Sequence, residues 1–176
     1  MVAWQDEAGD CNMTRRNLML VALGICLMSA PVNATPPNKV LGAWSMVSAQ
    51  IDPEGKNLPA YGVRPSGLLT FTPDMHYIAV MTDSDIPRFA SNVRGGGTDA
   101  ENRAAMAGSI GFFGTHTVDE NGEFSGNNVE GSTFPNWVGS VRTRKELRMV
   151  VDGDLMTESF QRPDGTKIVI RWQRVR

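Results

Sequence analysis

The chain has 176 residues, with 17 lysines and arginines against 19 aspartates and glutamates. This length fits one domain, and the net charge of −2 argues against a nucleic-acid-binding surface, which usually carries a basic excess. Two cysteines are too few for a disulfide-dense scaffold or a cysteine-based zinc site. The 18 glycines and 10 prolines favour a turn-rich β protein over a helical bundle.

The N-terminal part of the chain has the features of a secretory signal peptide. Arg15-Arg16 precede an uninterrupted apolar run at residues 18–30, and residues 32–34 (VNA) form an exit similar to an Ala-x-Ala cleavage site. The run is shorter than the roughly 20 residues of a membrane span. We therefore expect a signal peptide over residues 1–34, cleavage near Ala34, and export to the periplasm or secretion without a stable membrane span.

The start of the gene product is expected to lie inside this segment. Acidic residues precede the arginines, and a signal peptide does not begin in that way, so Met13 is the expected true start. Cleavage removes both Cys11 and Cys26, and a cysteine-free mature chain suits an oxidising compartment. Both the general secretory and the twin-arginine routes stay open. The predicted folded domain covers residues 35–176.

In the mature chain, short apolar or alternating stretches are separated by turn residues, which is typical of strands. The expected strands are residues 41–51, 66–72, 75–82, 110–118, 123–130, 139–150, 154–161 and 167–175. Short strands joined by hairpin turns predict an all-β antiparallel barrel or sandwich. A capping box of Thr98 and Glu101 predicts one short helix at about 98–108.

Several motifs point to one family. Residues 41–44 (LGAW) are similar to the G-x-W of lipocalins, and further stretches follow at 72–74 (TPD), 87–90 (PRFA), 113–115 (FGT) and 129–139 (VEGSTFPNWVG). In this order they resemble the short bacterial and fungal lipocalin-like domain family over about residues 39–175. The resemblance implies an eight-stranded calycin-type barrel with an internal cavity, and no single established activity.

The resemblance also implies roles for individual residues. In lipocalin-like barrels a tryptophan near the start of the first strand plugs the closed end and a late arginine covers it, which suggests structural roles for Gly42, Trp44 and Arg174. Members often carry a histidine pair just before the V-E-G-S stretch. This chain has Asn127-Asn128 there, so an acid–base role of such histidines is absent.

Strand alternation predicts a mixed pocket inside the barrel. It places Phe112 and His116 on one inner wall and Tyr77 with Met81 on another, while His76 faces out. Asn128 is expected beside the first wall through the hairpin at residues 119–122. The expected polar groups of the pocket are Tyr77, His116 and Asn128. The opposite strand parity would instead build it from Phe113, Thr115 and Asn127.

Two further segments bear on this pocket. Trp137 belongs to an aromatic loop at residues 134–137 that forms either a packed corner or a lid whose aromatics contact a ligand. Arg142, Arg144 and Arg148 share one face of the strand expected at 139–150. We expect that face to be solvated, with the alternative that it turns inward and one arginine pairs with a ligand carboxylate.

These features predict an exported protein that binds a small apolar molecule inside its barrel. The alternative is a cofactor-free barrel enzyme, an isomerase, cyclase or hydratase for a small apolar substrate, with His116, Tyr77 and the asparagines as acid–base groups. A third hypothesis is a filled barrel with a surface interaction role. No nucleotide-binding or metalloprotease motif is present, and two histidines are too few for a dedicated metal site, so no cofactor or metal is expected. The oligomeric state and the ligand stay open.

Overall fold

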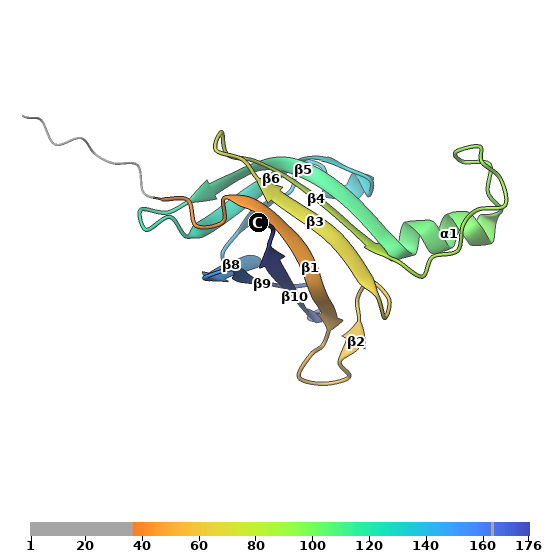
Figure 1. Ribbon diagram of the computed structural model, residues 1–176, viewed down its shortest axis with the longest axis horizontal. Coiled ribbons are helices and arrows are strands. Elements are labelled where there is room, and N and C mark those ends of the chain that lie inside the picture. Colours follow the sequence, from red (N-terminus) through yellow and green to blue (C-terminus); the bar gives the residue numbers. More distant parts are fainter. Residues whose placement is uncertain (1–36, 163) are drawn as a thin grey trace, which may run out of the picture. The chain divides into compact units, whose positions relative to one another are not determined.

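The computed structural model describes residues 37–162 and 164–176, so the expected signal peptide, its cleavage site and the Met13 start lie outside the described residues. The described part is an antiparallel, nearly closed β-barrel with one short helix (Figure 1). Its strands are β1 (Gly42–Ile51), β2 (Leu58–Pro59), β3 (Pro65–Phe71), β4 (His76–Asp83), β5 (Ser109–Val118), β6 (Phe124–Ser132), β7 (Val141–Thr143), β8 (Leu147–Asp152), β9 (Leu155–Gln161) and β10 (Lys167–Arg174).

The sheet runs in the hydrogen-bonded order β7-β6-β5-β4-β3-β1-β10-β9-β8, and the short β2 pairs only with β1. The two ends of this order, β7 and β8, follow each other in the chain through a tight turn. The sheet therefore curls back on itself, but its ladder stops at β7 on one side and at β8 on the other. The predicted all-β antiparallel barrel with one helix is confirmed, although nine strands form its wall rather than eight.

The additional strand arises because the segment expected as one strand at 139–150 is broken in two. A turn interrupts it, with the Glu146 backbone N–H donating to the Thr143 carbonyl at 3.1 Å. The Glu146 carboxylate also accepts from the Thr143 backbone N–H at 2.8 Å and from its hydroxyl at 2.6 Å. A threonine–glutamate turn carries no glycine or proline, so the usual turn signal was missing.

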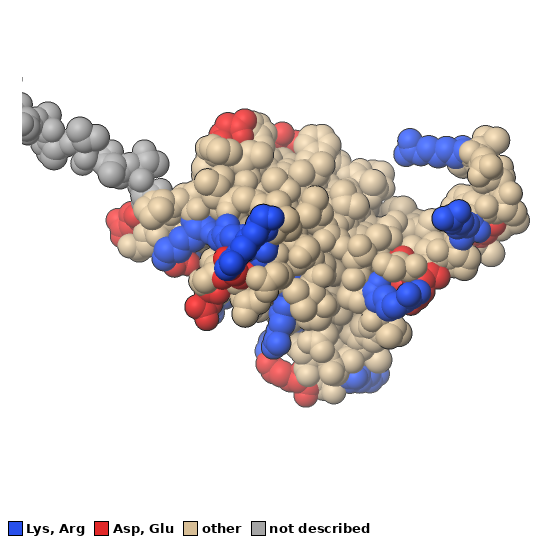
Figure 2. Space-filling model, viewed as in Figure 1, with Lys and Arg blue, Asp and Glu red and all other residues tan. Residues whose placement is uncertain are grey.

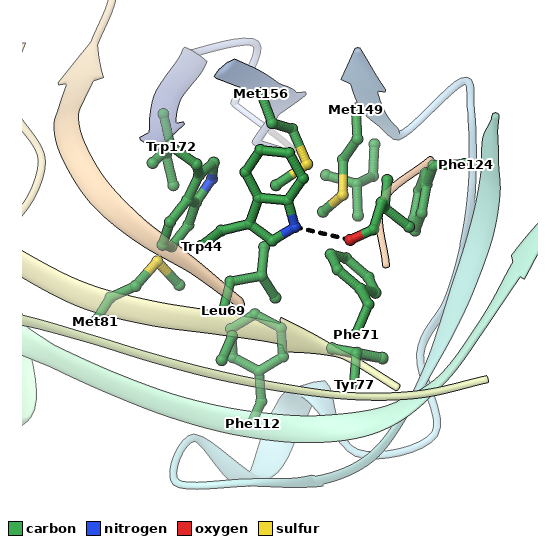
Figure 3. Close-up of a cluster of buried hydrophobic side chains, with 14 of the residues drawn as sticks. Trp44, Leu69, Phe71, Tyr77, Met81, Phe112, Phe124, Met149, Met156 and Trp172 are labelled. Carbon is green, nitrogen blue, oxygen red and sulfur yellow. Dashed lines mark hydrogen bonds between the residues drawn. The ribbon is translucent and has the colours of Figure 1, made fainter. Parts of the chain in front are cut away.

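The core fills the barrel because the apolar residues alternate along each strand. Along β4, Tyr77, Ala79 and Met81 are buried while His76 is exposed, as the alternation predicts. Trp44 is fully buried at the centre of the cluster in Figure 3, and its indole N–H donates to the Val40 carbonyl at 2.7 Å. The other fully buried large side chains include Trp172, Phe71, Phe124, Leu69, Leu147, Met156, Ile168 and Ile170.

The helix α1 (Asp99–Gly108) has the predicted capping box: the Glu101 backbone N–H donates to the Thr98 hydroxyl, and the Glu101 carboxylate accepts from the Thr98 backbone N–H. None of its residues is buried, and Figure 1 shows it standing off from the sheet between β4 and β5. A second short element, the 3-10 helix η1 (Pro135–Trp137), lies between β6 and β7. On the face shown in Figure 2, basic and acidic side chains are interspersed rather than separated into patches.

Candidate functional site

A small cavity of about 10 Å³ lies inside the barrel. A cavity of that volume can hold about one water molecule. Four polar side chains, those of Tyr77, Asn127, Arg142 and Glu158, reach it. The other walls are apolar and consist of Leu69, Phe71, Ala79, Met81, Phe112, Leu147 and Met149. A few polar groups converging on an otherwise apolar interior is the usual composition of a small-molecule site, and Figure 3 shows several of the apolar walls.

Arg142 enters the cavity from the short strand β7. Its Nε donates to the Asn127 side-chain oxygen at 3.2 Å. Its guanidinium carbon lies 5.6 Å from the Phe112 ring centroid and 5.7 Å from that of Trp137. The Nη2 atom is buried and has no hydrogen-bond partner among the described residues. An unsatisfied buried donor costs about 1–3 kcal/mol and more when it is charged, so a group that accepts from this atom would be stabilised here.

Glu158 faces the same cavity from β9. It is only 4% exposed, and its carboxyl accepts from the Trp172 indole N–H at 2.9 Å. Burial raises the pKa of Glu158, although the Trp172 hydrogen bond and the charge of Arg142 act in the opposite direction. Among the described residues, no ion pair within 4.0 Å joins Arg142 to this or any other acid. The two opposite groups therefore share a cavity without being paired.

Tyr77 is the third titratable group on the cavity. Its hydroxyl lies 3.5 Å from the Asn128 backbone oxygen, a long hydrogen bond. Burial raises the pKa of Tyr77, and the nearby Arg142 and Asn127 side chains only partly oppose this. Tyr77 therefore stays a neutral hydroxyl that can donate a hydrogen bond to an occupant of the cavity.

The structure brings together part of the predicted pocket. Tyr77, Met81 and Phe112 line the cavity. Trp137 packs edge-on against Phe112, with ring centroids 5.3 Å apart, and is half-buried. It covers residues that line the cavity without lining it itself. That these side chains contact a ligand stays a prediction.

His116 points inward, as predicted, but lies beyond the cavity toward the closed end. It is 2% exposed, and its ring packs edge-on against Phe71 at 4.8 Å between centroids. Its Nε2 lies 2.9 Å from the Asn38 amide nitrogen, while Nδ1 is buried without a partner among the described residues. Burial lowers the pKa of His116. The residue is thus part of the wall that ties the start of the domain to β5.

Asn128 does not face the cavity, and the placement predicted for it is wrong. Its neighbour Asn127 is 6% exposed and lines the cavity instead. The cause is a bulge in β6: Val118 pairs with Phe124 and Thr117 with Gly126, which leaves Ser125 as an extra residue. A bulge reverses the alternation beyond it, so His116 pairs with Asn127 on the inner face.

The arginine expectation also needs correction, because the three arginines do not share one outer face. Arg144 and Arg148 are exposed, whereas Arg142 turns inward, which was the alternative. Glu158 was not among the predicted site residues. Its signal was the alternation of β9, which places it in phase with the buried Met156.

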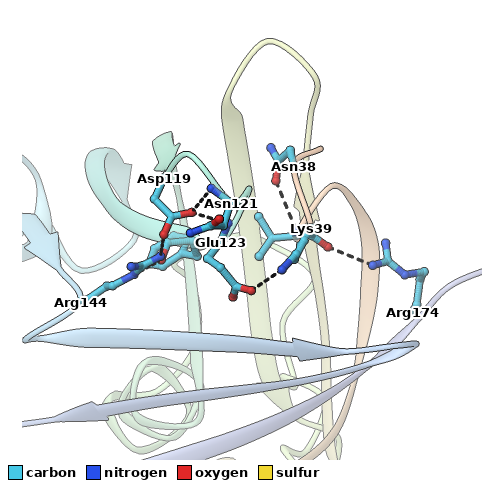
Figure 4. A network of polar contacts seen from close by, with 9 residues as sticks. Asn38, Lys39, Asp119, Asn121, Glu123, Arg144 and Arg174 are labelled. Carbon is cyan, nitrogen blue, oxygen red and sulfur yellow. Dashed lines mark hydrogen bonds and ion pairs between the residues drawn. The ribbon is translucent and has the colours of Figure 1, made fainter. Parts of the chain in front are cut away.

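The closed end of the barrel contains the three predicted structural residues. The Arg174 guanidinium lies over the Trp44 ring, and one of its nitrogens donates to the Leu41 carbonyl at 2.5 Å. Another donates to the Lys39 carbonyl at 3.1 Å (Figure 4). Gly42 has φ of +109°, and a Cβ there would lie 3.2 Å from Arg174 Nη1. Figure 4 also shows Lys39 paired with Glu123 across this end, at 2.5 Å.

The described residues also lack two further features, a metal-binding cluster and a membrane-spanning helix. They contain no group of three or more histidine, cysteine, aspartate or glutamate side chains placed to hold a metal ion. They also include no helix with the length and apolar character needed to cross a membrane.

The fold and the enclosed cavity define a lipocalin-type barrel. A model of the lipocalin-like domain family matches residues 41–175, and the chain belongs to this family. A search of curated proteins found no match, and neither did a search of solved structures.

Proposed function

We propose that the protein binds a small apolar molecule inside its barrel. The observation that carries this proposal is the convergence of Tyr77, Asn127, Arg142 and Glu158 on a cavity with otherwise apolar walls. One of these groups, the buried Arg142 Nη2, has no hydrogen-bond partner among the described residues, and an acceptor on a ligand would remove the cost of leaving it unsatisfied. Family membership supports the same interpretation, because small lipocalin-type barrels can hold one small ligand.

Binding requires the cavity to widen, because its present volume of about 10 Å³ is too small for an organic ligand. Two of its walls are the methionines Met81 and Met149. Methionine is unbranched and flexible and can repack around a ligand. Trp137 lies in the short helix η1 and packs on Phe112, so its movement would open the side of the cavity next to Phe112.

The first test is native mass spectrometry of the protein purified from a host that exports it. Ala79 lines the cavity, so Ala79→Leu would fill the interior, whereas Val80→Leu adds its methylene on the exposed side of the same strand. We expect a co-purified small molecule with the wild type and the Val80 variant and none with the Ala79 variant. A wild-type barrel that is always empty would favour the filled-barrel hypothesis instead.

A second candidate function is catalysis without a cofactor. The observation that favours it is the meeting of a neutral tyrosine, a cation and a carboxyl with a raised pKa at one cavity, here Tyr77, Arg142 and Glu158. A protonated carboxyl can act as a general acid. His116, placed beyond the cavity, loses its part in this hypothesis. A co-purified molecule that is chemically changed by the wild type but not by Glu158→Gln would assign catalysis, and one recovered unchanged would assign binding.

The proposal includes export of the mature domain. It draws on Arg15-Arg16, the apolar run at 18–30 and the exit at 32–34. N-terminal sequencing of the protein from its host should find Thr35 as the first residue. A folded protein that still begins at Met13 or earlier would contradict cleavage.

A further inference from the structure

We propose that the interior site selects a monocarboxylate with an apolar body, and that Arg142 binds its carboxylate. This inference rests on the proposed function, because it names the class of molecule that the cavity takes. Arg142 is the one cation among the described residues that line the cavity.

The guanidinium of Arg142 is held by its neighbours but keeps one buried donor without a partner among the described residues. Its Nε is used by the Asn127 side-chain oxygen at 3.2 Å, and the Phe112 and Trp137 rings flank it at 5.6 Å and 5.7 Å. These contacts fix the plane of the group. The Nη2 atom is buried without a partner among the residues the structure describes. A guanidinium N–H of this kind is a strong donor to a carboxylate oxygen.

The charge of Arg142 is not neutralised by the protein around it. Within the described part of the chain, Glu158 is the only other charged residue on the cavity wall, and no ion pair within 4.0 Å connects the two groups. Glu158 is instead held by the Trp172 indole N–H at 2.9 Å, and its burial favours the neutral carboxyl. One carboxylate would satisfy the buried Nη2 donor of Arg142, whereas a dianion such as a phosphate monoester would meet no second cation among the described residues that line the cavity.

The apolar walls of the cavity determine what kind of body the bound carboxylate can have. Beyond the four polar groups, the cavity is lined by side chains such as Met81, Phe112 and Met149, which offer no hydrogen-bond partner to a second polar group. The neutral Tyr77 hydroxyl lies near Arg142 and can donate to the same carboxylate. Once widened, the cavity would therefore suit a short alkyl or aryl chain with a single acidic end.

The test is a titration of the protein at pH 7.5 with octanoate, octan-1-ol and octylamine, which share one chain length and differ in head group. Binding is followed by calorimetry and by the NMR signals of the arginine side chains. We expect octanoate to bind at least tenfold more tightly than octan-1-ol, octylamine to bind most weakly, and the Arg142 Nε signal to shift with octanoate.

Variants then assign the preference to one residue. Arg142→Met keeps an unbranched side chain of similar length and should lower octanoate affinity at least tenfold while octan-1-ol binding persists. Arg148→Met, on the exposed side of β8, is the matched control and should change neither. The three-ligand comparison uses the wild type, so the inference stays testable if the Arg142 variant does not fold.

The two levels of the proposal fail in different ways. Equal binding of octan-1-ol and octanoate would overturn the carboxylate inference and leave interior binding intact. Binding of none of the three would overturn both. Tighter octanoate binding that survives in Arg142→Met would also overturn the inference, because the carboxylate would then be held elsewhere.

Discussion

The guanidinium carbon of Arg174 lies 4.0 Å from the centre of the Trp44 ring, so the last strand of the barrel covers the first. The two residues also face each other in the β1–β10 register. A cation over an indole contributes about 0.5–2 kcal/mol, and the same guanidinium holds the carbonyls of Lys39 and Leu41. The closed end is therefore stabilised by one interaction that joins both ends of the domain.

Truncation of Trp44 should be among the most damaging single changes. Trp44 is fully buried, so Trp44→Ala should lower the free energy of unfolding by about 3–5 kcal/mol. Trp137→Ala should cost clearly less, because that ring is only half-buried. Urea unfolding followed by far-UV circular dichroism compares the two. Equal losses would move Trp137 into the core and remove its role as a cover.

Gly42 should not tolerate a side chain. Gly42→Ala forces an alanine into φ of +109° and places its Cβ 3.2 Å from Arg174 Nη1. We expect a loss of about 1–3 kcal/mol in the free energy of unfolding from the backbone strain. Gly111→Ala is the control, since that position has ordinary φ and no neighbour closer than 3.4 Å. Thermal unfolding should separate them, and similar melting temperatures would show that the Gly42 site relaxes.

Acid should weaken the fold through His116. Burial lowers its pKa in the folded protein, so below about 6.5 the unfolded chain binds a proton that the native state does not. Stability is therefore full above that pH and falls as the pH drops toward the folded pKa. His116→Gln should flatten this part of the curve in urea unfolding between pH 7.5 and 5. An unchanged slope in His116→Gln between these pH values would contradict the expected effect.

Glu158 should change the pH dependence of stability in the opposite direction to His116. Burial raises its pKa, so its contribution to stability is full below about 4.3 and is lost as the pH rises toward the folded pKa. Glu158→Gln keeps an acceptor for the Trp172 indole N–H and cannot ionise. The variant should gain stability relative to the wild type as the pH rises from 4 to 8. The exposed Glu120→Gln is the matched control, and a wild type that is more stable than Glu158→Gln at pH 8 would contradict the expected effect.

Much of the fold could be predicted because local signals agree with it. The Thr98–Glu101 capping box and the alternation along β4 each specify their element without help from the rest of the chain. Two expectations were wrong, the inward placement of Asn128 and the single strand at 139–150, and they share a physical origin. A bulge at Ser125 and a turn built on Thr143 and Glu146 depend on how neighbouring strands pair, which no short stretch of sequence encodes.

The same two errors concern the residues of the site. The bulge brings Asn127 rather than Asn128 to the cavity, and the turn frees Arg142 from the face that carries Arg148. Tyr77, Met81 and Phe112 could be placed correctly because they lie on regular stretches of strand. Strand alternation therefore located the apolar walls, while the polar groups depend on irregularities.

The strand ladder of the barrel is interrupted between β7 and β8. On either side of this interruption the strands are paired, but across it the wall is continuous only through the turn and side-chain packing. Backbone amides of Val141–Thr143 should exchange with deuterated solvent sooner than those of the central strands β3 and β10, which have partners on both sides. Arg142 lies on β7 beside this interruption. A movement of β7 that admits a ligand would therefore also move the side chain proposed to bind it.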